Sequence, residues 1–487
     1  MLRKISGLIK NGIIIIYLEL LLRISSQQII YPLKMINSTF SKYKKAENIF
    51  IKTSSLSNIN CFNSLKKNIF TETPRILSSK IDILNSMLFA TEIEIGSNSQ
   101  KFNVILDTGS QILWVPEINS TVSNPEIKNF YEPEKSKTSK NIHRELEVVY
   151  GTGYCQGYFY KDLIKFLSND KYYLFFGSAN NSIFDVEGSE GILGLARTYP
   201  NDSLSPMLTL KNNGVIKSAS FSFKYDKIKN ELYMYAGKPH KDFETKNIPF
   251  CNLLSNNNYE KILWACELNN FGFIKNSSKL EHEENIFTKT NTSIIFDTGT
   301  NSIILPYDLI FALKEKIKKY NCVLGSSASI DSDDATAFVI CFDVDRIPDI
   351  GLQFGDYILI LNRYKMFYAI DFGFGITGYL LNVQFQKNLW TAIIGQNFFT
   401  EFHTLFDPEN KVLKFYSDSK DKIIWIKQNN NGENNIGIIF ILLILIILVA
   451  GCIFYRYLRK NNSEYNYNWM GPNDEINSKF NNISLNT

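Results

Sequence analysis

The sequence predicts an all-β protein that contains two copies of one β lobe, followed by a membrane-spanning helix. Three observations support this fold class. Short aromatic and apolar runs such as YYLFFG and SASFSFKY alternate with Gly, Asn and Ser turns, which is typical of half-buried strands. The tripeptide Asp-Thr-Gly occurs twice, each time after a β-branched apolar run. Residues 436–455 carry no charge.

The bulk composition excludes some function classes. At 487 residues the chain is too long for one ordinary core, so two or three units are expected. Its 52 basic and 48 acidic side chains give a net charge of only +4, without the basic stripe of a nucleic-acid-binding protein. The seven cysteines show no C-x-x-C or His-rich spacing. We therefore expect no nucleic-acid partner, no metal and no cofactor.

The N-terminal residues 1–25 are predicted to be a signal peptide. Arg3, Lys4 and Lys10 precede the apolar stretch GIIIIYLELLL, in the order of a secretory signal. The stretch is short for a membrane span and is interrupted by Glu19, although an N-terminal anchor stays an alternative. A secretory signal would place the following residues in the secretory pathway.

The run at 436–455 is predicted to be a transmembrane helix. About 20 apolar residues cross ~30 Å of hydrocarbon. Arg456, Arg459 and Lys460 follow it, so the tail at 456–487 is expected in the cytoplasm and the preceding residues on the lumenal or extracellular side. A buried core helix is the alternative. The sequence thus predicts a single-pass type I membrane protein.

The two Asp-Thr-Gly motifs, at Asp107 and Asp297, belong to an internal repeat. Each is followed at a comparable distance by an apolar-apolar-Gly strand, which begins at Ile192 in the first copy and at Ile393 in the second. A duplicated β lobe leaves this pattern. Two unrelated type I turns with Asp at the first position are the alternative.

A close pair of aspartates has a defined chemistry. Two carboxyl groups within hydrogen-bonding distance cannot both ionise cheaply, so they share one proton. One member then acts as a base toward water while the other acts as an acid toward a peptide carbonyl. Asp107 and Asp297 are the candidate catalytic residues.

The residues after each aspartate suit this role. Gly109 and Gly299 lack a Cβ and allow the two loops to approach closely. Hydroxyl groups at the next position can bond the outer carboxylate oxygens, and those at the position before can brace one loop against the other. These expected supporting residues are Thr108, Gly109, Ser110, Thr298, Gly299 and Thr300.

The sequence from about residue 85 to 420 resembles the pepsin-like aspartic proteases, including the plasmepsin-type enzymes of apicomplexan parasites. The resemblance rests on DTGSQILWVP, VVYGTG and EGILGLA in the first half, and on IIFDTGTNSI, CFDVDRIPDI and AIIGQNFFTEFHTLFDPENKVLKF in the second. It implies a bilobal pepsin-like fold: two antiparallel β lobes, 81–255 and 256–420, with a catalytic cleft between them. It also implies an aspartic endopeptidase that prefers hydrophobic residues at the cleavage site.

The resemblance assigns further residues to the site. VVYGTG would form a mobile flap over the cleft, with the Tyr150 hydroxyl available to Trp114; an ordinary exposed hairpin is the alternative. Apolar side chains would line substrate pockets, although they are as easily core residues. The flap and substrate-binding residues expected are Tyr150, Gly151, Thr152, Gly153, Trp114, Ile183, Phe184 and Ile192. As a departure from the family, Gln396 stands where many relatives have Asp.

The cysteine positions suggest two disulfides. Cys322 and Cys341 enclose a polar loop that a bridge would hold, and Cys251 and Cys266 could link adjacent strands. Cys155 follows the flap glycines. It could be a buried thiol, a partner for Cys61 or a redox-sensitive group, and the first is favoured.

The remaining segments complete the expected organisation. The resemblance favours a prosegment at 26–80, although a flexible linker is the alternative, and 421–435 is predicted to be a polar stem. The protein would be a membrane-anchored zymogen whose monomeric catalytic unit acts on protein or peptide substrates. A catalytically inactive pepsin-like surface binding module is the competing hypothesis.

Overall fold

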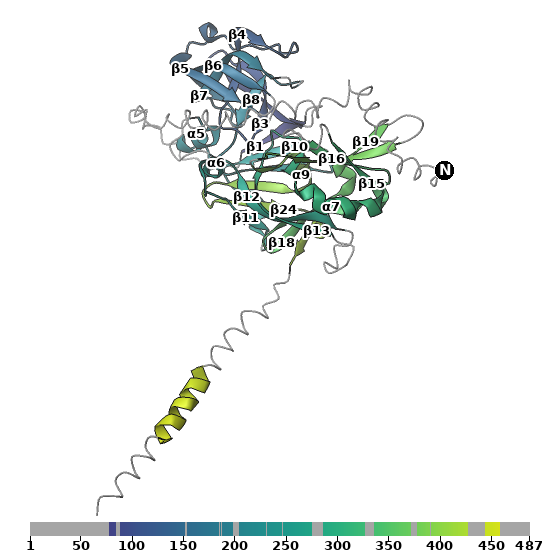
Figure 1. The fold of residues 1–487 in the computed structure, drawn as a ribbon. Coiled ribbons are helices and arrows are strands. Elements are labelled where there is room, and N and C mark those ends of the chain that lie inside the picture. The colour runs from purple at the N-terminus through teal and green to yellow at the C-terminus, as the bar shows by residue number, and fades with distance from the viewer. Residues whose placement is uncertain are drawn as a thin grey trace, which may run out of the picture. The chain divides into compact units, whose positions relative to one another are not determined.

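The computed structural model describes 14 residues near the C-terminus, 444–457, and most of the chain between 77 and 426. The described ranges are 77–83, 88–150, 153–184, 186, 188–197, 204–229, 231–245, 247–274, 286–326, 336–371, 377–389, 391–426 and 444–457. The chain divides into two compact units, Met1–Ile426 and Lys427–Thr487. The first unit is mostly β, and its strands form two large sheets (Figure 1).

The first sheet contains 13 strands of the described ranges. In spatial order they are β11 (Phe250–Asn252), β24 (Val412–Tyr416), β23 (His403–Asp407), β9 (Phe221–Asp226), β10 (Glu231–Ala236), β1 (Leu77–Ile83), β2 (Phe89–Ile95), β3 (Gln100–Asp107), β8 (Gly191–Gly194), β4 (Trp114–Val122), β7 (Tyr172–Ile183), β6 (Tyr154–Lys165) and β5 (Lys140–Val149). Most neighbours are antiparallel, but β3 with β8 and β4 with β7 are parallel.

The second sheet has 12 strands of the described ranges. Their order is β19 (Phe367–Asp371), β20 (Thr377–Leu381), β16 (Thr336–Cys341), β21 (Val383–Gln386), β14 (Ile303–Pro306), β22 (Ala392–Ile394), β13 (Ile286–Phe296), β12 (Ala265–Ile274), β17 (Asp349–Phe354), β18 (Tyr357–Leu361) and β25 (Ile423–Trp425), with β15 (Cys322–Ser326) paired to β16. The described part of the chain is therefore bilobal and sheet-rich, as the sequence predicts.

Helices are short in the described ranges of the first unit. They are α5 (Pro206–Asn212), α6 (Asn258–Ile262), α7 (Leu309–Ile317), α8 (Arg363–Met366) and α9 (Gln396–Glu401), together with 3-10 turns at Pro133–Lys135, Lys241–Glu244, Lys318–Tyr320, Val344–Arg346 and Lys420–Lys422. Local caps explain several starts: the Ser205 side chain accepts a bond from Leu208 N before α5, and the Asn257 side chain accepts one from Glu260 N before α6.

The chain crosses between the two sheets near its C-terminal end. Strands β23 and β24 follow the second aspartate in the sequence, yet β23 pairs with β9 and β24 with β11 in the first sheet. β25 then returns to the second sheet and pairs with β18. The first sheet thus receives strands from both halves of the sequence, whereas all strands of the second sheet lie between residues 265 and 425. The late strands β23 and β24 join the two lobes through backbone hydrogen bonding.

Buried aromatic side chains support this crossover. The ring of Phe221 on β9 stacks on Phe406 of β23 with centroids 4.8 Å apart, and Trp264 packs edge-on against both rings. The Trp264 Nε1–H donates to the Leu195 carbonyl, 2.9 Å away, which follows β8. Burying several aromatic rings at one junction provides much of the apolar stabilisation of the interface between lobes.

The structure contains both predicted disulfides, Cys251–Cys266 and Cys322–Cys341. The second bridge joins directly opposed residues of β15 and β16, so it closes the hairpin that contains the polar loop. Cys155 is a buried free thiol in β6. Cys61, its alternative partner, lies outside the described residues.

Several terminal predictions fall wholly or partly outside the described residues. The predicted signal peptide at 1–25 lies wholly outside the described residues. The predicted prosegment at 26–80 also lies outside them, except for residues 77–80 at the start of β1. At the other end, β25 lies inside the range predicted as a stem. Residues 444–457 are helical (yellow in Figure 1), whereas 436–443 are not described. Within the described ranges, no helix combines the length and apolar character that crossing a bilayer requires.

Candidate active site

Each Asp-Thr-Gly motif lies at the end of a buried strand that a parallel strand holds in place. Asp107 ends β3 and is paired with Gly194 of β8, and its carbonyl accepts a bond from Leu195 N at 2.7 Å. Asp297 follows β13, and its N–H donates to the Ile394 carbonyl of β22 at 2.9 Å. The apolar-apolar-Gly strands that revealed the repeat are thus the strands that support the two aspartates.

Two threonines connect the aspartate loops across the lobes. The Thr108 N–H donates to Thr298 Oγ1 at 3.1 Å, and the Thr298 N–H donates to Thr108 Oγ1 at 2.9 Å. Each hydroxyl in turn donates to a carbonyl of the opposite lobe, Thr108 to Phe296 at 2.8 Å and Thr298 to Leu106 at 2.6 Å. Both threonines are fully buried. Their reciprocal bonds fix the separation of the two loops.

The glycines allow the carboxyl groups to meet. A Cβ added to Gly109 would lie 2.7 Å from Asp297 Cγ, and one added to Gly299 would lie 2.5 Å from Asp107 Oδ1. No side chain fits at either position, because each glycine backbone contacts the aspartate of the other lobe. The two carboxyl groups are within hydrogen-bonding reach of each other.

Matching donors orient both carboxyl groups. The Gly109 N–H donates to Asp107 Oδ1 at 2.8 Å, and the Gly299 N–H donates to Asp297 Oδ1 at 2.7 Å. Ser110 Oγ donates to Asp107 Oδ2 at 2.5 Å, and Thr300 Oγ1 donates to Asp297 Oδ2 at 2.8 Å. The site is therefore nearly two-fold symmetric in its hydrogen bonds, with one set of donors from each lobe.

Burial breaks this symmetry. Asp107 is 6% exposed, whereas Asp297 is partly exposed. Burial and the neighbouring charge of Asp297 raise the pKa of Asp107 well above its usual range, and these effects outweigh the opposing bond from Ser110. The arrangement therefore favours a proton on Asp107.

Tyr150 lies over this site. Its hydroxyl accepts a bond from Trp114 Nε1 at 2.8 Å and also interacts with Ser110. The Tyr150 N–H donates to the Gly153 carbonyl at 2.8 Å, which closes a tight turn between β5 and β6. Gly151 and Thr152, the predicted tip of the flap, lie outside the described residues.

The three predicted pocket residues differ in exposure. Ile183 is 45% exposed, whereas Phe184 and Ile192 are buried. The Phe184 ring packs edge-on against Trp114 with centroids 5.2 Å apart, and Ile192 belongs to the same buried cluster. Phe184 and Ile192 thus belong to the buried cluster that packs around Trp114. The Ile183 side chain is instead exposed to solvent.

Sequence reasoning missed the hydrogen bonds of two residues, Gln396 and Arg197. The Gln396 Nε2–H donates to the Thr298 carbonyl at 2.6 Å, and the Gln396 N–H donates to the Thr300 carbonyl at 2.8 Å, so this residue holds the second aspartate loop from behind. Arg197 donates to the carbonyls of Leu254 at 3.1 Å and Glu260 at 2.8 Å. The presence of Gln at position 396, where many relatives have Asp, could have drawn attention to this residue. No sequence pattern pointed to Arg197.

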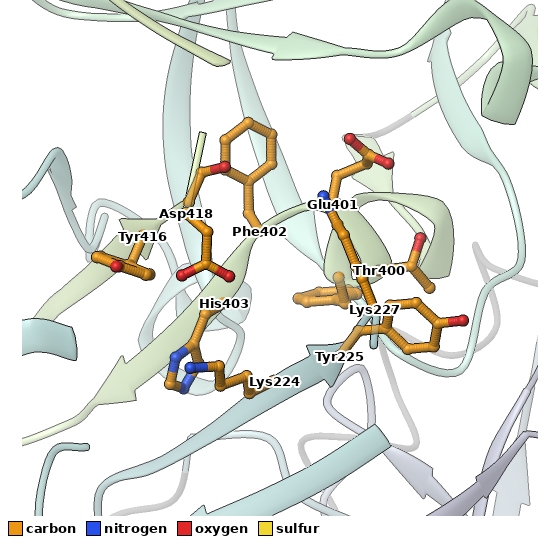
Figure 2. Close-up of a pocket in the computed structure, with 11 residues that line it drawn as sticks. Lys224, Tyr225, Lys227, Thr400, Glu401, Phe402, His403, Tyr416 and Asp418 are labelled. Carbon is orange, nitrogen blue, oxygen red and sulfur yellow. The ribbon is translucent and has the colours of Figure 1, made fainter. Parts of the chain in front are cut away.

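A separate pocket is lined by residues from β9, α9, β23, β24 and the segments next to them, and neither catalytic candidate is among them (Figure 2). Next to it, the only group of described side chains that could hold a metal brings together His240, Asp242 and His403, with ligand atoms within 4.8 Å of one another. Lys224 Nζ, however, lies 2.6 Å from Asp242 Oδ2, and His403 Nδ1 lies 2.9 Å from the same oxygen. Because the ammonium group already pairs with this carboxylate, we interpret the group as a buried ion-pair network.

His403 gives this network a predicted effect on stability. Its ring is buried between Asp242 and Ser222, and burial lowers its pKa to about 4 despite the bond to Asp242. The unfolded chain, with an ordinary histidine pKa near ~6.5, binds this proton at higher pH than the folded chain does. As the pH is lowered from about 6.5 to 4, the free energy of unfolding should therefore fall. The contribution of His403 to this fall is about 3 kcal/mol.

Urea unfolding at several pH values measures this effect. Replacing His403 with glutamine should flatten the decline in this pH range, whereas His143→Gln, at an exposed histidine, should leave the slope as in the wild type. An unchanged slope in His403→Gln would show that the ring does not bind its proton in the way described.

Comparison with known proteins identifies the class. Residues 88–417 match the model of the family described as "Eukaryotic aspartyl protease", and the chain belongs to that family. Its similarity to individual members is modest. It is 26% identical to plasmepsin I of Plasmodium falciparum (isolate 3D7) over 342 residues, which cover 69% of each chain. It is 27% identical to a vacuolar aspartic protease of Candida albicans over 341 residues, 68% of this chain and 75% of the relative.

A mammalian relative can be aligned over a similar number of residues. The chain is 27% identical to pepsin II-2/3 of Oryctolagus cuniculus over 345 residues, which cover 68% of this chain and 80% of the relative. These relatives support a hydrolase of the aspartic protease kind.

Proposed function

We propose that this protein is an active aspartic endopeptidase. The observation that carries the proposal is the pair of carboxyl groups of Asp107 and Asp297, oriented by matching donors and close enough to share a proton. A hydrophilic pair of this kind is costly to bury without a role. Perturbed carboxyl pairs in clefts are characteristic of catalytic acids and bases.

The geometry supports a reaction through activated water. A water molecule between the carboxyl groups gives a proton to Asp297 as its oxygen attacks the peptide carbonyl carbon, while protonated Asp107 gives its proton to the carbonyl oxygen. The resulting diol collapses as the C–N bond breaks. One diol hydroxyl returns its proton to Asp107 as the carboxyl C=O forms, and the amine nitrogen takes a proton from Asp297, which restores the starting protonation of the pair. Thr108 and Thr298 hold both groups in place, so little reorganisation is needed.

The substrates are proteins or peptides with hydrophobic residues beside the cleaved bond. The exposed side chain of Ile183, next to the Trp114–Phe184 cluster, supports an apolar contact on the substrate. Tyr150 and the flap would cover the bound peptide and exclude water other than the reacting molecule. Both aspartates come from one chain, which favours a monomeric catalytic unit.

The protein would be made as a zymogen in the secretory pathway, with a lumenal or extracellular catalytic part. The basic-then-apolar N-terminus and the two disulfides support this routing. The basic segment at 26–80 would cover the acidic site until it is cleaved, and the uncharged run at 436–455 would anchor the chain in the bilayer.

A catalytically inactive binding module remains the alternative function. Such a module has no need for two aspartates, two contacting glycines and the reciprocal threonine bonds, and all of these are present here. The intact site therefore favours the enzyme.

A cleavage assay separates the two functions. The processed protein should hydrolyse a peptide with paired hydrophobic residues between pH 4 and 7, and a statine-type inhibitor, whose hydroxyl mimics the diol, should block it. Absence of cleavage over this range by a correctly processed, folded sample would favour the binding module.

A further inference from the structure

Strand β4 contains an outward bulge that the catalytic site does not explain. Pro116 pairs with Ala179 and Thr121 pairs with Asn181, so the four residues 117–120 stand opposite the single residue Asn180 of β7. A bulge of this kind directs the intervening side chains away from the sheet. Its base is fixed by a bond from Ile118 N–H to the Tyr131 carbonyl at 2.9 Å.

Asn119 is one of the four residues in this bulge. Its backbone φ is +65°, which lies in the left-handed region. Asn is one of the few residues other than glycine that adopt this region readily. Its side chain is exposed, and Ile118 beside it is 42% exposed. An exposed asparagine next to an unprotected apolar side chain is a suitable position for a bulky polar group.

The tripeptide Asn119-Ser120-Thr121 has the Asn-X-Ser/Thr pattern that accepts N-linked oligosaccharide in secreted proteins. Two other such tripeptides lie in the described residues, beginning at Asn180 and Asn291. Both of these asparagines are exposed, but the third residue is buried in the first tripeptide and half-buried in the second. Only in Asn119-Ser120-Thr121 are the first and third residues both exposed in the described ranges.

We propose that Asn119 is an N-glycosylation site, an inference that rests on the proposed secretory routing. In the transfer, the Asn119 side-chain nitrogen forms a bond to the anomeric carbon of a lipid-diphosphate-linked oligosaccharide. The bond from that carbon to the diphosphate breaks, the amide loses one proton, and the lipid diphosphate leaves. Folding then keeps the glycan outside the sheet, where it covers Ile118.

The position of Asn180 favours a single occupied site on this face. Asn180 lies directly opposite the bulge, so glycans on Asn119 and Asn180 would compete for the same space. Ser182, which completes the second tripeptide, is buried between strands. We therefore expect occupancy at Asn119 and none at Asn180 in the folded protein.

Mass spectrometry of the full chain, expressed in a eukaryotic host and extracted from its membranes, tests the proposal. Enzymatic release of glycans in heavy-oxygen water should convert Asn119 into labelled aspartate. Asn119→Gln and Thr121→Ala should each remove one glycan unit from the intact mass. Thr121→Ser, which keeps the hydroxyl, and Ser120→Ala, which leaves the acceptor pattern intact, should both retain it.

The outcomes distinguish this inference from the routing on which it rests. Glycans at Asn291 or at other acceptors with an unmodified Asn119 would overturn the inference and leave the secretory routing standing. A chain that reaches no glycan-transferring compartment, with every acceptor unmodified, would overturn both. If a variant does not fold, the labelled peptide of the wild type still decides between these outcomes.

Discussion

Replacing Asp107 with asparagine is expected to lower kcat/KM for a hydrophobic peptide by about a thousandfold or more. Asparagine has nearly the same shape. Its carbonyl oxygen can still accept the bond from Gly109 N–H, and its NH2 group can donate to Ser110 Oγ, so the loop should stay in place. It cannot hold the shared proton, however, and the carbonyl oxygen of the substrate loses its acid. Loss of general acid–base catalysis typically costs 10²–10⁴-fold, and here both functions depend on one pair.

The same change at Asp297 should give a comparable loss, because the water then lacks its base. Asp308→Asn provides a matched control, since Asp308 is exposed and its side chain forms no cap bond at the start of α7. Steady-state kinetics on processed protein, with circular dichroism to confirm folding, measures the effect. Substantial activity in either dyad variant would be incompatible with a mechanism that uses both carboxyl groups.

Replacing Thr298 with valine is expected to destabilise the fold and to reduce activity together. Valine keeps the shape but removes the hydroxyl that accepts from Thr108 N–H and donates to the Leu106 carbonyl. Both backbone groups are then buried without these partners, and each costs about 1–3 kcal/mol. The free energy of unfolding should fall by about 2–6 kcal/mol.

Thr298→Ser is the control for this prediction. Serine restores the hydroxyl and loses only a methyl group, for about 1 kcal/mol. Urea unfolding and kcat/KM should therefore place the serine variant near the wild type and the valine variant well below it. Equal behaviour of valine and serine would mean that packing, and not the reciprocal hydrogen bonds, holds the loops together.

The parts of the site that could be predicted from sequence are those formed by short motifs that occur in both halves of the repeat. Each Asp-Thr-Gly motif carries its own strand, glycine and hydroxyl, so the contact of Gly109 with Asp297 and of Gly299 with Asp107 follows once the repeat is recognised. The disulfide between Cys322 and Cys341 could also be predicted from sequence, because the two cysteines flank one hairpin.

Other features depend on contacts between distant segments. The placement of β23 and β24 in the first sheet follows from how Phe406 packs on Phe221, and no local pattern encodes this pairing. The same is true of the His403–Asp242 bond, which joins side chains far apart in sequence. For Phe184, sequence could not choose between pocket and core, because both require an apolar side chain; the structure places it behind Trp114.

The central claim is that Asp107 and Asp297 together hold the attacking water and one shared proton. A crystal structure of the processed protein with a statine-type peptide tests this most directly. We predict that the inhibitor hydroxyl lies between the two carboxyl groups and within hydrogen-bonding distance of both. An inhibitor that binds elsewhere, or whose hydroxyl contacts neither aspartate, would contradict the proposed mechanism.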